Sequence, residues 1–191
     1  PTSATIKAKS KVTGLVDKGA DKGALILTER TLKDAESGLD LATLTSTTFA
    51  RGNGGYDGPS DEAPRPHKVP EREPDFAVDL TTLDMAALIY RLSGDYNPLH
   101  ASPSVAKAAG FPKPILHGLC SLGVAGHAIL KGCCDYDAKR LKSLQLRFSS
   151  PVYPGETVRT EIWRDGANIS FKSKIVERDV VVLDNGHATV E

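Results

Sequence analysis

Net charge, long apolar runs and a cysteine framework are all absent from this sequence of 191 residues. Its 24 Lys and Arg residues balance its 24 Asp and Glu residues, so it lacks the charged surface that nucleic acids and anionic membranes attract. No run approaches the ~18 apolar residues of a membrane span, and the opening PTSATIKAKS has no apolar signal core. We expect a protein that binds neither nucleic acid nor membrane.

Cysteine is scarce as well. The three residues Cys120, Cys133 and Cys134 cannot form a disulfide framework, and the vicinal pair has no second C-x-x-C or regularly spaced histidine to complete a zinc site. We therefore expect a reducing compartment and no bound metal. Cys120 is interpreted as a small core residue, and Cys133 and Cys134 as the end of a helix.

Composition divides the chain into three parts. Gly and Pro occupy 9 of the 23 positions from 52 to 74, which predicts a linker. Before it, residues 1–51 contain three predicted strands, at 11–16, 24–28 and 39–49, and no convincing helix. After it, residues 75–191 carry helices first and strands later, an α+β order.

Three helices are predicted after the linker. Thr81–Asp84 resembles a capping box and leads into a helix that runs to about Leu92. Ser102 and Pro103 are typical of an N-cap and first helical residue, and Gly110 of a helix stop. Residues 115–131 are apolar nearly all round, which predicts a buried helix, and Gly123 and Gly126 are interpreted as packing residues on it.

Alternating strands follow these helices. Leu144, Leu146 and Phe148 alternate with polar residues, as do Val158 and Ile162. Asp165-Gly166 predicts a hairpin turn, and Asn185-Gly186 a second turn before the last strand. Small residues on the buried helix favour a sheet that wraps around it. The order of strands and turns in the first fifty residues echoes this sheet, so we interpret them as part of an incomplete repeat.

The loop SGDYNPLH carries the residues best suited to chemistry. Gly94 permits a tight turn and Pro98 holds Asn97 extended, so Asp95, Asn97 and His100 are polar groups on a constrained loop. A carboxylate and an imidazole that converge on one water suit general acid–base catalysis. These residues alone favour the alternative in which Asp95 caps the turn and His100 caps the next helix, because Asp and Asn are commonplace in turns. His117 and His127 are interpreted as structural histidines.

A longer set of segments resembles a known family. It consists of SGDYNPLH, the following helix, GFPKPILHGLCSLG, Arg147-Phe148 and PVYPGET. Together they resemble the (R)-specific enoyl-CoA hydratase family, which includes MaoC-like dehydratases and the hydratase region of the peroxisomal multifunctional β-oxidation enzyme. The resemblance implies a hot-dog fold, an antiparallel sheet wrapped around a long central helix, present as a tandem double hot dog with the first repeat incomplete. It also implies hydration of trans-2-enoyl-CoA to the (3R)-3-hydroxyacyl-CoA, without a cofactor or metal.

The resemblance also assigns residues. Asp95 and His100 match the catalytic dyad, Asn97 the amide of the same loop, and Gly118 the backbone donor to the thioester oxygen. Contacts with acyl-CoA are implied for Phe148 and Lys18, and we add the remaining residues of the loop, Tyr96, Pro98 and Leu99. The family's first repeat begins with a helix that has no counterpart here, so the chain is expected to be a fragment.

Alternatives remain open at this point. They are a 3-hydroxyacyl-ACP dehydratase, a hot-dog thioesterase, and a non-catalytic module for acyl binding or dimerisation. The expected partners are enoyl-CoA and hydroxyacyl-CoA, together with a second copy in a homodimer. The resemblance implies a peroxisomal location, although no S-K-L address is visible; without it, a cytoplasmic location is expected.

Overall fold

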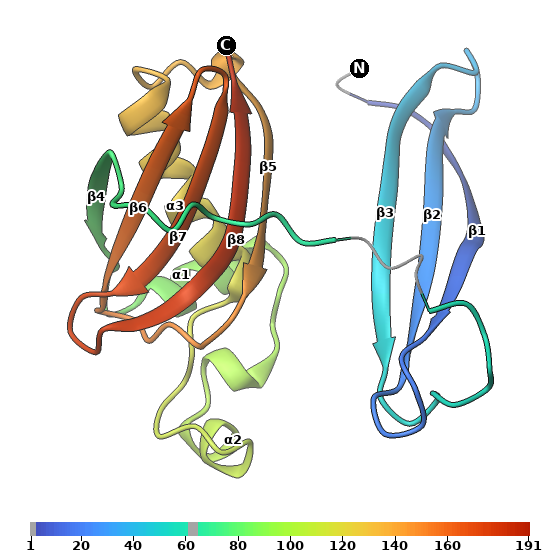
Figure 1. Cartoon of the computed structure of the whole chain (residues 1–191), viewed down its shortest axis with the longest axis horizontal. Coiled ribbons are helices and arrows are strands. Elements are labelled where there is room, and N and C mark those ends of the chain that lie inside the picture. Colours follow the sequence, from blue (N-terminus) through green and yellow to red (C-terminus); the bar gives the residue numbers. More distant parts are fainter. Residues whose placement is uncertain (1–2, 61–64) are drawn as a thin grey trace. The chain divides into compact units, whose positions relative to one another are not determined.

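The chain forms two compact units, which divide between Arg65 and Pro66 (Figure 1). This computed structural model describes residues 3–60 and 65–191. Within these residues no helix has the length and apolar character needed to cross a membrane. The second unit contains helices and an antiparallel sheet, so the predicted α+β class is confirmed.

The first unit is a three-stranded antiparallel sheet in the order β1-β2-β3. Its strands are Ile6–Asp17, Ala24–Asp34 and Asp40–Ala50, so the three predicted strands are present and longer than expected. Val16 and Ala24 are buried, but Ile6, Val12 and Phe49 expose about half or more of their surface. In the described part of this unit, most apolar side chains therefore have no covering layer.

Part of the Gly- and Pro-rich segment is folded onto this sheet. The Asp17 carboxylate accepts hydrogen bonds from the backbone N–H groups of Gly55 and Gly19, both at 2.8 Å. These bonds favour the charged form and lower the pKa of Asp17. The Asp17 N–H donates to the Pro59 carbonyl at 2.7 Å. One buried carboxylate thus holds the β1–β2 turn and the segment after β3 together.

The second unit is built on a five-stranded antiparallel sheet in the order β4-β6-β7-β8-β5. Its strands are Phe76–Thr81, Leu141–Phe148, Thr157–Asp165, Asn168–Ile175 and Val180–Val190. Alternate residues of β7 are buried, because successive side chains of a strand point to opposite faces. The sheet therefore has one apolar face to cover.

Helix α3, Gly118–Cys133, covers that face (Figure 1). Ala125, Ala128 and Ile129 are fully buried and belong to one core with Ile162 and Phe171 of the sheet. A Cβ atom on Gly126 would lie 3.2 Å from the Leu144 side chain, which confirms its packing role. Gly123 faces open space, so the packing interpretation was wrong for that residue.

The ends of helices α2 and α3 lie close to the predicted positions. Helix α3 begins at Gly118 rather than at Ile115, and it ends at Cys133 with Cys134 as its C-cap, as expected. Both thiols are buried, and burial raises their pKa values. Cys120 is only partly buried. Helix α2, Pro103–Ala108, has the predicted N-cap Ser102, and Gly110 follows it at φ +88°.

The predicted capping box was wrong. Helix α1 spans only Ala86–Tyr90 and continues as a 3₁₀ turn, η1, at Arg91–Ser93. The Thr82 hydroxyl donates to the Glu156 carbonyl at 3.0 Å, and the Thr81 hydroxyl lies 3.0 Å from that of Thr157. These side chains bond to the segment beside them in the sheet because β4 continues to Thr81.

The two predicted hairpin turns have different outcomes. Asp165 pairs with Asn168 across a two-residue turn, as expected. Asn185-Gly186 instead lies inside β8, where the pairing register shifts, and Asn185 has φ +53°. The Asn185 amide donates to the His67 carbonyl at 2.6 Å. The turn prediction was wrong because this pair forms an irregularity in a strand that binds the segment before β4.

We expect Gly186→Ala to destabilise the second unit strongly. An added Cβ would collide with the carbonyl oxygen and ring of Phe171, and close packing leaves no room for either to move. The free energy of unfolding should fall by about 1–3 kcal/mol, measured by urea denaturation. Gly123→Ala is the matched control, and it should stabilise α3 by roughly 0.5–1 kcal/mol. Equal effects of the two changes would contradict this packing.

Candidate active site

The predicted catalytic loop is held by its own side chains. Gly94 ends η1 with φ +109°, a conformation that favours glycine. The Asp95 carboxylate accepts from the Asn97 N–H at 3.2 Å, and the Asn97 side-chain oxygen accepts from the Leu99 N–H at 3.1 Å. Asn97 thereby caps the 3₁₀ turn Pro98–His100, η2. The local constraint expected from Gly94 and Pro98 is present, with Asp95 and Asn97 exposed to solvent.

The orientation of His100 fixes which ring nitrogen is free. His100 Nδ1 lies 2.8 Å from the Ile115 carbonyl oxygen. A carbonyl only accepts hydrogen bonds, so Nδ1 carries the proton and the neutral ring keeps its lone pair on Nε2. A tautomer held in this way leaves Nε2 as the acceptor for a proton.

His117 lies between both members of the predicted dyad. It is 1% exposed, its ring stacks on His100 with centroids 3.8 Å apart, and its Nε2 lies 3.1 Å from the Asp95 carbonyl oxygen. Burial lowers its pKa. The sequence interpretation as a structural histidine did not place it here. Its position directly before Gly118, in the HGL step, was the available signal.

The three side chains converge. Asp95, His100 and His117 each offer one oxygen or nitrogen within 4.8 Å of the others, a spacing that also raises the question of a metal. The two imidazoles are stacked at an interplanar angle of 24°. His100 Nδ1 and His117 Nε2 also serve carbonyl oxygens.

Gly118 and His100 open onto one cavity of about 310 Å³. Gly118 is the first residue of α3, so its N–H has no intrahelical acceptor and lies at the positive end of the helix dipole. The described residues offer that N–H no other backbone acceptor. Most of the remaining wall is apolar or small, formed by Phe111, Ile115, Leu116, Ser121, Phe148, Ser149, Ser150, Pro151, Val152 and Leu183.

Phe148 is the predicted substrate contact that the structure brings to this cavity. Its ring lies 3.3 Å from where a Cβ atom of Gly118 would stand, and 49% of its surface is exposed. Tyr96, Pro98 and Leu99 belong to the loop and to η2 beside His100, and Tyr96 is 61% exposed. Lys18 belongs to the first unit, where its N–H donates to the Gly23 carbonyl at 3.0 Å. Its assignment stays a prediction.

A second cavity, of about 320 Å³, also borders His100. Its other lining residues include Leu88, Ala101 and Pro114, with Lys113 as a cation on its wall. His100 therefore stands between two hollows, one leading to Gly118 and Phe148 and the other to α1. The sequence did not single out Lys113, which is an exposed lysine in a loop.

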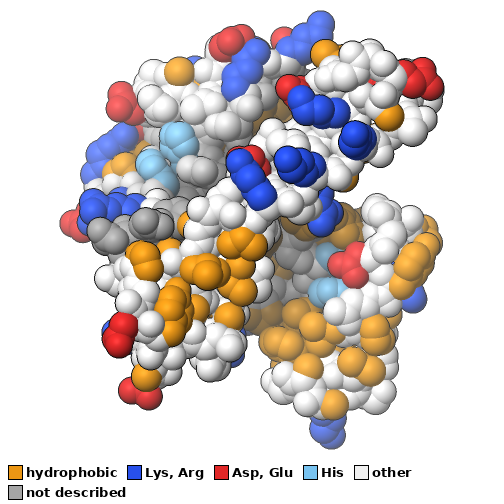
Figure 2. Space-filling view, turned by 90° about the vertical axis from the view of Figure 1, so that its right-hand side faces the viewer, with side chains coloured by type: hydrophobic (Ala, Val, Ile, Leu, Met, Phe, Trp, Pro, Cys, Tyr) orange, Lys and Arg blue, Asp and Glu red, His pale blue; other side chains and the backbone are white. Residues whose placement is uncertain are grey.

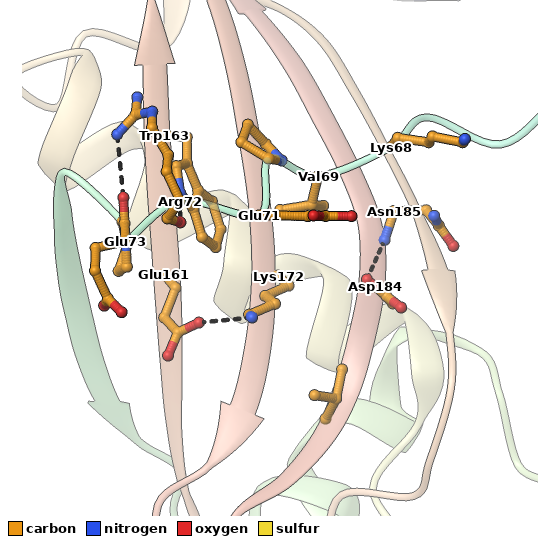
Figure 3. A pocket seen from close by; sticks show the side chains of 13 residues that line it. Lys68, Val69, Glu71, Arg72, Glu73, Glu161, Trp163, Lys172, Asp184 and Asn185 are labelled. Atoms are coloured by element: carbon orange, nitrogen blue, oxygen red, sulfur yellow. Dashed lines mark hydrogen bonds and ion pairs between the residues drawn. The ribbon is translucent and has the colours of Figure 1, made fainter.

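A larger cavity, about 710 Å³, lies elsewhere, between residues 68–74 and the outer face of the sheet (Figure 3). Its charged groups are of both signs: Lys172 pairs with Glu161 at 3.3 Å, and Glu71, Glu73 and Asp184 lie beside Lys68 and Arg72. Trp163 Nε1 donates to the Arg72 carbonyl at 2.8 Å. This hollow holds none of the predicted site residues.

Large apolar side chains are exposed around the candidate site. Leu88, Leu92 and Leu119 expose 50%, 75% and 62% of their surface. Figure 2 shows hydrophobic side chains gathered in patches on one face of the molecule, with lysine and arginine in other areas.

The family model of the MaoC like domain matches residues 66–186. The chain belongs to the MaoC-like domain family. The antiparallel sheet and the helix of its second unit are consistent with the hot-dog fold of that family.

Curated relatives of this MaoC-like chain include two at 41% identity. They are "3-hydroxyacyl-thioester dehydratase Y" of Mycobacterium tuberculosis and the peroxisomal "Enoyl-CoA hydratase 2" of Arabidopsis thaliana. The matches cover 97% and 96% of this chain but only 66% and 62% of those proteins, so the chain spans less than two thirds of their length.

A solved structure has the same fold along nearly the whole chain. The crystal structure of a MaoC-like dehydratase from Phytophthora capsici is 42% identical, with a TM-score of 0.84, over 97% of this chain and 64% of that one.

We expect Gly118→Pro to lower kcat by about 10²- to 10³-fold, the scale for losing one oxyanion donor. Proline removes the N–H at the first helical residue, where the fold tolerates it best. Gly118→Ala keeps the N–H but brings a methyl to 3.3 Å from the Phe148 ring, so it should act mainly on KM. Steady-state kinetics with crotonyl-CoA distinguish the two. A folded Pro variant with unchanged kcat would rule out this donor.

Proposed function

We propose that this chain carries the site of an (R)-specific hydratase, which adds water to trans-2-enoyl-CoA and forms (3R)-3-hydroxyacyl-CoA. The main support is the placement of His100 and Gly118 on one cavity, with the Asp95 carboxylate beside His100. Hydration needs a group that activates water, a proton source and a donor to the thioester oxygen. These three residues supply that set.

In this proposal Asp95 and His100 hold one water molecule. The water oxygen adds to C3 of the enoyl group, and one water proton passes to the dyad through an acceptor such as His100 Nε2. The electron pair of the double bond moves toward the thioester, and a proton from the dyad then goes to C2. Both elements of water add to one face of the double bond, and the face that the substrate presents to the dyad sets the proposed R configuration at C3. Asn97 caps η2 and thereby holds His100 at the end of the loop.

The Gly118 N–H is proposed to meet the negative charge that develops on the thioester oxygen. It stands at the start of α3, where the helix dipole favours negative charge, and it has no side chain to block the thioester. The apolar wall with Phe148 would then contact the acyl part of the substrate. Tyr96, Pro98 and Leu99 would contact it from the loop, and Lys18 is proposed as a contact from the first unit.

The same site catalyses dehydration when the reaction runs backwards. The printed name of one relative, a 3-hydroxyacyl-thioester dehydratase, describes that direction, and that of another, an enoyl-CoA hydratase, describes hydration. A carrier-protein thioester would use the same residues. We propose CoA as the carrier on the names of the hydratase relatives.

For the whole protein we propose a tandem arrangement. Residues 1–51 would be the last strands of a first hot-dog repeat, 52–74 the linker, and 75–191 the complete catalytic repeat. The relatives are longer than this chain, which allows the rest of a first repeat. We also propose a homodimer, and a peroxisomal location on the names of relatives such as the peroxisomal multifunctional enzyme type 2 of Mus musculus.

We expect Asp95→Asn and His100→Gln each to lower hydratase kcat by about 10²- to 10⁴-fold, the range for a general acid–base group. The double variant should lose little more, because the two residues act on one water. The assay follows hydration of crotonyl-CoA and of a longer enoyl-CoA, with chiral analysis of the product.

His127→Gln is the matched control, since His127 is an exposed histidine on α3 that bonds to Tyr136. It should keep full activity. Near-normal turnover in either dyad variant, or an S product, would contradict the proposal.

A further inference from the structure

His117 touches both members of the proposed dyad without reaching the substrate. Its Nε2 lies 3.1 Å from the carbonyl oxygen of Asp95, which cannot donate, so Nε2 carries the proton. Its ring lies 3.8 Å from that of His100 at an interplanar angle of 24°. Neither of the two cavities that His100 borders is lined by His117.

The surroundings of His117 keep its ring neutral. The ring is 1% exposed and packs against Tyr90 on α1, with centroids 4.7 Å apart. The charged and titratable groups that face it are Asp95, His100 and Arg91. Burial is the largest cause that lowers its pKa, and Nδ1 is buried with no hydrogen-bond partner in the part of the chain that the structure describes.

From these contacts we infer that His117 is the positioning residue of the hydratase site, fixing the Asp95 loop to the start of α3 and holding the plane of the His100 ring. The inference rests on the proposed function. His117 is the N-cap of α3 and Gly118 is its first helical residue. The residue that contacts the dyad therefore directly precedes the proposed oxyanion donor in the chain. Displacement by about 1 Å in such a unit can lower the rate by 10²-fold.

Three variants separate the two contacts. His117→Phe keeps an aromatic ring on His100 but removes the N–H donor, His117→Gln keeps a donor of similar reach but removes the ring, and His117→Ala removes both. We expect kcat for crotonyl-CoA to fall by about 10- to 100-fold in the His117→Phe and His117→Gln variants and further in His117→Ala. KM should change less than about twofold. His127→Gln is the control on the same helix.

A spectroscopic readout on the unmodified protein keeps the test independent of activity and of variant folding. In ¹⁵N-labelled protein the neutral His117 imidazole should be the Nε2–H tautomer, and it should titrate at a lower pH than an exposed histidine, which titrates near 6.5. His117→Phe should also shift the His100 ring resonances, because the two rings are in contact.

The outcomes distinguish the inference from the proposed function. Wild-type kcat in a folded His117→Phe or His117→Ala variant, or titration of His117 near pH 6.5, would overturn the positioning role even if hydration occurs. Absence of hydration by the unmodified protein would overturn the proposed function, and with it a hydratase role for His117. A fall in kcat without change in KM, together with titration of His117 below the pH of an exposed histidine, supports both.

Discussion

The burial of α3 against the five-stranded sheet is the constraint on which the candidate site depends. Ala125, Ala128 and Ile129 are inaccessible to solvent and pack with Ile162 and Phe171, so the helix has one allowed position and rotation. A close-packed core of this kind does not permit gradual sliding. The first residue of the helix is therefore fixed, and with it the Gly118 N–H, the His117 ring and the contacts of both.

The polar groups of the site are held by backbone more than by one another. The Ile115 carbonyl accepts a hydrogen bond from His100 Nδ1, and the Asp95 carbonyl accepts one from His117 Nε2. Asn97 caps the turn that ends at His100. Backbone acceptors cannot change protonation, so they define the histidine tautomers at every pH at which the rings are neutral. The Asp95 carboxylate and His100 Nε2 are left for solvent or substrate.

The two faces of the sheet have different roles in the second unit. The inner face packs on α3 and supports the site, while the outer face is crossed by the segment before β4, held by Trp163, Ser170 and Asn185 (Figure 1). The outer hollow is large but contains paired charges of both signs. Volume alone therefore does not select the candidate site, which instead combines the Gly118 N–H at the start of α3 with the His100 ring on one cavity.

The sequence by itself determined the strands, the buried helix, the constrained loop and its polar residues, because alternation, all-round apolarity and Gly or Pro positions are local properties. It was wrong at Thr81–Asp84 and at Asn185-Gly186, where cross-strand hydrogen bonds replaced the expected cap and turn. The contacts of His117 reach residues 17 and 22 positions away, His100 and Asp95. Only the tertiary structure decided these contacts, since packing of α3 brings those distant residues together.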